Sequence, residues 1–243
     1  MEELKKEEVL FVGTYTDNGS EGIYRFKFNV ETGRLENKTV AATLENPSFM
    51  TFSPDKKMMY AVGEVDNFKD DSGTVTTFRV KDTVLQKIDT KSSHGANPCY
   101  VGIDHSGHFV AIANYTGGNV AIYRTLDNGN LEDSPQVIDH KVLDTSKAAH
   151  AHMSTFIKGE LFVSDLGLDL INKYNEINGE FVPSAQKSLV VAEGAGPRHF
   201  VASENGKFLY VINELNSTIT LFQKEKEEFF VIDTYETVAN DHE

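Results

Sequence analysis

Short apolar strands separated by polar turns recur along this chain with a period of about 50 residues. Four segments share one layout: a start at Asn-Pro, Gly-Pro or His-x-His, a short apolar strand, a turn, a second apolar strand and a closing polar residue. These segments cover residues 46–64, 97–114, 150–165 and 196–214, and they close at Glu64, Asn114, Asp165 and Glu214. The closing residues are 50, 51 and 49 positions apart, which indicates an internal structural repeat.

Each unit continues with two further strands. A turn rich in Gly, Asn and Asp leads to a third alternating strand, and a more polar fourth strand follows. The third strands read GIYRFKF, TVTTFRV, NVAIYRT, LINKYNE and TITLFQK. Four hairpin-linked strands per unit are typical of the blades of a β-propeller, and no sustained helical periodicity competes with this interpretation.

The sequence therefore predicts an all-β fold, a single β-propeller domain over residues 1–243. The first unit starts at its second strand and four complete units follow, so we expect 19 strands in about five antiparallel blades. No strand near the C-terminus supplies the missing innermost strand of the first unit, so we expect an open ring. Unpaired strand edges and uncovered blade faces favour self-association.

Candidate functional residues come from the places where the first two strands of a unit begin and end. These strands are antiparallel neighbours, so the residue that starts the first strand and the residue that closes the second lie at the same end. His152 and Asp165 hold these places in one unit, and Arg198 and Glu214 hold them in the next. Because the first strand of each blade lines the central channel, we expect these side chains to converge at one rim.

Structural roles compete with these assignments. The pairs Asn46-Pro47 and Asn97-Pro98 are turn signals. Asn114 and Asp165 can complete turns instead of contacting a ligand.

The charged and histidine residues also have alternatives. The structural alternative for Glu214 is an ion pair that neutralises Arg198. Of the pair His150 and His152, we expect one to face the channel and favour His152; a metal shared between the two histidines is not expected.

Composition and charge narrow the class of protein. The net charge is −14 and Cys99 is the single cysteine, so the acidic balance argues against nucleic-acid binding and no intrachain disulfide can form. A local pocket can still be basic on an acidic protein. No apolar run is long enough for a transmembrane helix. The first residues, MEELKKEE, lack the apolar core of a secretory signal, so we expect a cytoplasmic protein.

Six motifs together resemble those of the seven-bladed β-propeller lactonases, the 6-phosphogluconolactonase type. They are FVGTYT (11–16), ANYTGGNV (113–120), HAH (150–152), SDLGLD (164–169), EGAGPRH (193–199) and NELNS (213–217). The resemblance covers nearly the whole chain, in the family's order, and about two of the seven blades have no counterpart in these 243 residues.

The resemblance implies hydrolysis of 6-phospho-D-glucono-1,5-lactone to 6-phosphogluconate in the pentose phosphate pathway. A related branch of the family converts carboxy-muconate to a lactone. Its proposed histidine, arginine and glutamate correspond to His152, Arg198 and Glu214, whereas its second arginine has no counterpart here.

We therefore expect His152 to act as general base and Arg198 to bind the oxyanion or the substrate phosphate. Glu214 is expected to orient the histidine or the water, or to act as the base itself. A δ-lactone hydrolyses readily, so no metal, cofactor or covalent nucleophile is required. The residues expected to bind substrate are His150, His199, Asp165 and Asn114.

Two alternatives stay open at this point. One is a lactonising cycloisomerase that acts on a carboxylated muconate at the same rim. The other is a non-catalytic propeller that binds a partner through its rim or its open edge.

Overall fold

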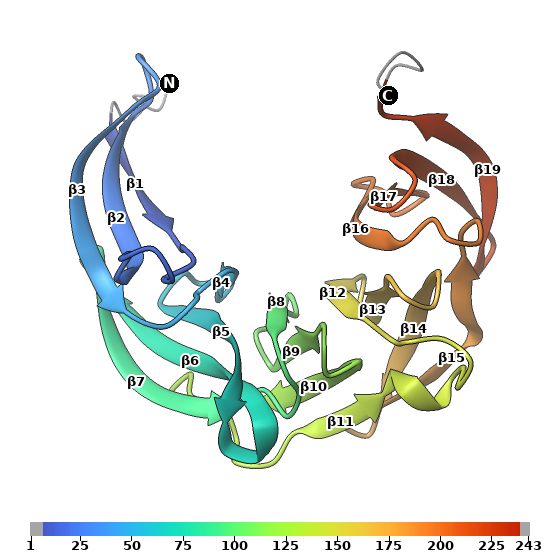
Figure 1. Ribbon diagram of the computed structural model, residues 1–243, viewed down its shortest axis with the longest axis horizontal. Coiled ribbons are helices and arrows are strands. Elements are labelled where there is room, and N and C mark those ends of the chain that lie inside the picture. Colours follow the sequence, from blue (N-terminus) through green and yellow to red (C-terminus); the bar gives the residue numbers. More distant parts are fainter. Residues whose placement is uncertain (1–6, 239–243) are drawn as a thin grey trace.

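The computed structural model describes residues 7–238, which form five antiparallel β-sheets arranged side by side along an open arc (Figure 1). We call these sheets blades 1 to 5 in chain order. Blade 1 has three strands and each of the others has four, so the 19 strands predicted for the chain are confirmed within these residues.

In blades 2 to 5, the order of the strands along the chain is also their order from the inner to the outer side of the arc. Blade 1 contains β1 (Glu7–Val12), β2 (Gly22–Asn29) and β3 (Arg34–Thr43). Blade 2 contains β4 (Met50–Phe52), β5 (Met58–Phe68), β6 (Ser72–Lys81) and β7 (Val84–Ser92). Blade 3 contains β8 (Pro98–Ile103), β9 (Phe109–Asn114), β10 (Asn119–Arg124) and β11 (Gln136–Asp139). Blade 4 contains β12 (Ala151–Ile157), β13 (Glu160–Asp165), β14 (Leu170–Ile177) and β15 (Glu180–Val190). Blade 5 contains β16 (Pro197–Ala202), β17 (Phe208–Asn213), β18 (Thr218–Glu225) and β19 (Glu228–Glu236).

Helical structure in this part of the chain is limited to two 3₁₀ turns, η1 (Lys69–Asp71) and η2 (His140–Val142). Neither is long enough to cross a bilayer, and residues 7–238 contain no other helix that could do so.

The hydrophobic core consists of layers between neighbouring blades. Between blades 2 and 3, for example, Tyr60 and Val62 pack with Val110 and Ile112. Similar clusters join blades 1 and 2, blades 3 and 4, and blades 4 and 5. Blades in the middle of the arc are covered on both faces, so their second strands read as continuous apolar runs.

Blade 5 lacks a neighbour on one side within the described residues. Its strand β17 alternates between buried and exposed positions, and the exposed side chains Tyr210 and Ile212 are apolar. Over residues 7–238 the arc is therefore open, as the strand count predicted (Figure 1), and exposed apolar side chains lie on the uncovered face of blade 5.

The turn that precedes the inner strand of blades 2, 3 and 5 contains a residue with a positive φ. Asn46, Asn97 and Gly196 adopt positive φ values of 43°, 52° and 66°, a region that glycine and asparagine tolerate best. A proline follows each of them. This confirms the interpretation of Asn46-Pro47 and Asn97-Pro98 as turns.

Candidate active site

A cavity of about 310 Å³ lies on the inner side of the arc, at the end of the blades where the inner strands begin. Every blade contributes to its wall. The lining residues are Tyr15, Ser48, Phe49, Glu64, Cys99, Tyr115, His152, Arg198, His199 and Glu214. The volume is at the lower end of the range for small-molecule sites.

One ring of lining residues comes from β-bulges at the start of the inner strands. The strand register shifts around Cys99 in blade 3, His152 in blade 4 and Arg198 in blade 5. Ser48 holds the same place in blade 2, because it follows Asn46 by two positions as Cys99 follows Asn97. A bulge leaves one residue unpaired and re-aims its side chain, which explains how equivalent positions all reach the cavity.

A second ring lies at the same end of the blades, within β5 in blade 2 and directly after the second strand in blades 3 and 5. The backbone N–H groups of Glu64, Tyr115 and Glu214 each donate to the carbonyl of the turn residue that precedes their inner strand, at 2.9, 3.0 and 2.8 Å. The equivalent residue of blade 4, Leu166, makes the same hydrogen bond but is not among the lining residues.

The structure does not place Asn114 and Asp165 in the cavity. They pair with Pro98 and Ala151 within their blades, one residue before the second ring, and both are fully buried. The alignment of the repeats that grouped them with Glu64 and Glu214 was therefore wrong by one position. A shift of one residue along a strand moves a side chain to the opposite face.

Tyr115 occupies the position in blade 3 that sequence reasoning gave to Asn114. A signal for it was present, because Glu64, Tyr115 and Glu214 each follow the preceding turn residue by 18 positions. Aligning the units from their starting turns, instead of from their polar closing residues, identifies the correct residue.

Asp165 organises the loop behind the cavity. Its Oδ1 accepts hydrogen bonds from the backbone N–H groups of His150 and Leu168, at 2.8 and 3.1 Å, and its Oδ2 lies 2.8 Å from His140 Nδ1. The other ring nitrogen of His140 is 3.0 Å from the Tyr174 hydroxyl. Asp165, His140, Tyr174 and Leu168 are buried and His150 is half-buried, so the contacts of Asp165 lie within the protein and fix this loop.

Asn114 is likewise engaged within the protein. Its Nδ2 donates to the Ser93 carbonyl and to Asn119 Oδ1, at 2.8 and 2.7 Å, and these bonds fix the turn beside it.

His150 and His152 differ in position, as expected, but because of the bulge. In a regular strand, residues two apart point to the same face. Here His152 lines the cavity, whereas His150 lies outside it and stacks on Tyr115 with ring centroids 4.5 Å apart. His150 Nδ1 also lies 3.0 Å from the Tyr115 carbonyl, so it supports Tyr115.

Two neutral imidazoles lie next to each other in the cavity. The rings of His152 and His199 are 5.1 Å apart. Burial, reinforced by the positive charge of Arg198, lowers the pKa of His152 to about 4. The same two causes lower the pKa of His199. Both histidines are therefore available as bases at neutral pH.

Arg198 provides the positive charge in the cavity and forms an ion pair with Glu214. Their side chains are 47% and 38% exposed, so both remain accessible to a ligand. The Cys99 thiol, in contrast, is a poor nucleophile, because burial raises its pKa to about 12. A neutral base beside a guanidinium and a carboxylate is suited to acyl chemistry on an ester.

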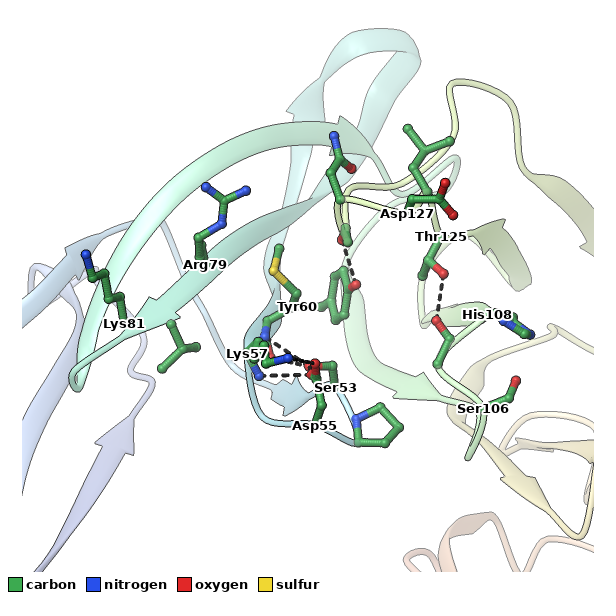
Figure 2. Close-up of a pocket in the computed structure, with 17 residues that line it drawn as sticks. Ser53, Asp55, Lys57, Tyr60, Arg79, Lys81, Ser106, His108, Thr125 and Asp127 are labelled. Atoms are coloured by element: carbon green, nitrogen blue, oxygen red, sulfur yellow. Dashed lines mark hydrogen bonds and ion pairs between the residues drawn. The ribbon is translucent and has the colours of Figure 1, made fainter.

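A second, larger groove lies at the opposite end of blades 2 and 3, with a volume of about 600 Å³ (Figure 2). Several of its polar groups are already hydrogen-bonded in turns. Tyr60 Oη donates to the Gly129 carbonyl at 2.7 Å, Thr125 Oγ1 donates to the Gly107 carbonyl at 2.6 Å, and Ser53 is bonded to Asp55 (Figure 2). Because its buried polar atoms are satisfied, chemistry favours the smaller cavity over this groove.

Comparisons with known proteins show the family of the chain. The sequence model of the family described as "Lactonase, 7-bladed beta-propeller" matches residues 9–243. The chain is 31% identical to a protein of Formosa agariphila, over 88% of this chain and 63% of that protein, and 29% identical to one of Bacillus subtilis, over 86% and 60%. Both are named 6-phosphogluconolactonase. The chain thus spans less than two thirds of the length of these relatives.

Solved structures give the same result for the fold. A putative 6-phosphogluconolactonase from Bacteroides fragilis is 30% identical with a TM-score of 0.87, over 98% of this chain and 69% of that chain. A periplasmic gluconolactonase from Pseudomonas aeruginosa is 26% identical with a TM-score of 0.88, over 98% and 70%.

Proposed function

Because this chain belongs to the seven-bladed β-propeller lactonase family, we propose that it hydrolyses 6-phospho-D-glucono-1,5-lactone to 6-phosphogluconate. The observation that carries the proposal is that one cavity contains both the neutral imidazole of His152 and the Arg198–Glu214 pair. Relatives named 6-phosphogluconolactonase support the choice of substrate.

His152 acts as the general base in this proposal. It takes a proton from a water molecule as the water oxygen bonds to the lactone carbonyl carbon. The bond from that carbon to the ring oxygen then breaks, and the ring oxygen receives the proton from the imidazolium. Such proton transfer is worth roughly 10²–10⁴-fold in rate. A pKa of about 4 keeps the whole His152 population in the base form at neutral pH.

Arg198 stabilises the negative charge that develops on the carbonyl oxygen, since its guanidinium is always protonated and presents several donors in a plane. Loss of an oxyanion donor typically lowers kcat by roughly 10²–10³-fold. Glu214 holds the guanidinium in place through their ion pair.

A hydrolysis assay tests the proposal. The protein is assayed on 6-phosphogluconolactone, on unphosphorylated gluconolactone and on carboxy-muconate, together with His152→Ala, Arg198→Ala and Glu214→Ala. We expect turnover of the phosphorylated lactone and a loss of at least tenfold in kcat/KM for each variant. His105→Ala, a surface histidine in the turn between β8 and β9, is the matched control. Turnover of the muconate alone, or wild-type kcat/KM in all three site variants, contradicts the proposal.

We propose a cytoplasmic location, because the relatives carry the name of an enzyme of the pentose phosphate pathway; subcellular fractionation tests it. We also propose self-association through the uncovered apolar face of blade 5, where Tyr210 and Ile212 are 42% and 45% exposed. Sedimentation velocity of the protein and of Ile212→Asp tests this, and a monomer in both cases contradicts it.

A further inference from the structure

The part of the cavity formed by blades 1 and 2 contains a carboxylate that the proposed reaction does not use. Glu64 in blade 2 is equivalent to Glu214 in blade 5, because both follow their turn residues by 18 positions and donate their N–H to the carbonyl of that turn residue. Glu214 is paired with Arg198. The blade 2 residue equivalent to Arg198 is Ser48, which carries no charge.

Glu64 is held in place without being neutralised. The Tyr15 hydroxyl donates to Glu64 Oε2 at 2.9 Å. The ion pairs formed among residues 7–238 do not include this carboxylate. A carboxylate accepts up to about four hydrogen bonds, so the phenol leaves most of its acceptor capacity free toward the cavity.

Buried polar atoms without a hydrogen-bond partner also line this cavity, and they indicate a ligand. In the described part of the chain, Ser48 Oγ, His152 Nδ1 and His199 Nε2 are buried and make no hydrogen bond. All three side chains line this cavity, and His152 is only 5% exposed. Buried polar groups are nearly always satisfied, so such a group of orphaned atoms indicates a polar molecule with several donors and acceptors.

We propose that Glu64, positioned by Tyr15, accepts hydrogen bonds from the ring hydroxyl groups of the lactone and thereby selects polyhydroxylated lactones. This inference rests on the proposed lactonase function. The two ends of the cavity differ in charge, with the guanidinium of Arg198 in blade 5 and the uncompensated carboxylate of Glu64 in blade 2. The lactone carbonyl therefore faces Arg198 and the hydroxyl edge faces Glu64.

The same charge difference directs a phosphate away from Glu64, since two anions repel in a partly buried site. Glu64 thus sets the orientation of the sugar ring, while the reacting carbonyl stays beside His152 and Arg198. It is a specificity-determining residue in this scheme, with no part in bond making or breaking.

The test compares two lactones that share a six-membered ring. D-Glucono-1,5-lactone carries hydroxyl groups and δ-valerolactone carries none. For Glu64→Gln, we expect kcat/KM on gluconolactone to fall roughly 10- to 100-fold, mainly through KM, the range for a hydrogen bond to a charged group. Activity on δ-valerolactone stays at the wild-type level. Tyr15→Phe shifts KM in the same direction by less, because the carboxylate remains.

Asp66→Asn is the matched control, an exposed carboxylate on the same strand outside the cavity. Equal losses on both lactones in Glu64→Gln, or no loss on either, overturn the inference while the lactonase function stands. If wild-type protein hydrolyses neither of these lactones nor 6-phosphogluconolactone, the proposed function fails. Calorimetric titration with D-gluconate then decides: weaker binding by Glu64→Gln but not by Asp66→Asn supports the role of Glu64, and equal or absent binding overturns it.

Discussion

Replacing Asp165 by alanine tests whether this residue is structural. The fully buried carboxylate accepts hydrogen bonds from the backbone N–H groups of His150 and Leu168 and from His140 Nδ1. Alanine leaves three buried donors without an acceptor. With about 1–3 kcal/mol for each unsatisfied group, and some relaxation of the loop, we expect a loss of about 4 kcal/mol in the free energy of unfolding.

The more conservative variant, Asp165→Asn, is expected to lose much less. The amide oxygen still accepts from the two backbone N–H groups. The proton of His140 can move to Nε2, so that Nδ1 accepts from the new amide and Nε2 donates to the Tyr174 hydroxyl. We expect a loss of about 1 kcal/mol.

Thermal unfolding followed by circular dichroism measures the difference. For a chain of this size, about 4 kcal/mol corresponds to a decrease of about 10 °C in Tm, and about 1 kcal/mol to a decrease of about 3 °C. An Asp165→Ala protein with unchanged Tm and reduced substrate binding would refute the placement of Asp165 outside the cavity. It would restore the ligand role that the sequence suggested.

Four further predictions concern the cavity and the residues around it. The pKa of His152 is about 4 in the folded protein and near its ordinary value in the unfolded chain. Between about pH 6.5 and 4 the unfolded chain therefore binds more protons, and the free energy of unfolding falls as pH falls. Urea unfolding at several pH values should show this fall, and the fall should be smaller in His152→Gln. For the same reason, kcat/KM should stay level from pH 8 to about pH 5 and decrease only near pH 4, and a midpoint near 6.5 would contradict the low pKa. Cys99, with a thiol pKa of about 12, should resist iodoacetamide at pH 8 in the folded protein and react once urea unfolds it, as thiol titration would show. His150→Ala removes the ring that stacks on Tyr115, and steady-state kinetics should show a few-fold higher KM with kcat nearly unchanged, whereas a loss confined to kcat would give His150 a direct catalytic role.

The sequence predicted only part of the candidate site and its surroundings. The repeat placed His152, Arg198 and Glu214 at one end of their blades, and the structure brings all three to one cavity. His140, in contrast, has no sequence signal. It lies in η2 after β11 and reaches Asp165 of the next blade, a contact that only the packing of blades 3 and 4 creates.

The blade 1 side of the cavity was missed for a related reason. Tyr15 follows the end of β1 by three residues, and although it belongs to the motif FVGTYT, its local sequence does not mark it as a partner of Glu64, which lies 49 residues later. Their contact depends on the placement of blade 1 against blade 2, which apolar residues such as Ile23 and Met59 determine.

Alternating apolar residues and turn signals act locally, so the amino-acid pattern alone predicted the period, the number of strands, the open arc and the blades that supply the histidine, arginine and glutamate. Which side chains face the cavity depends on how the strands pair and how the blades pack. A bulge or a one-residue change in strand register reverses the direction of a side chain, and that register is fixed by hydrogen bonds between strands and by packing between blades.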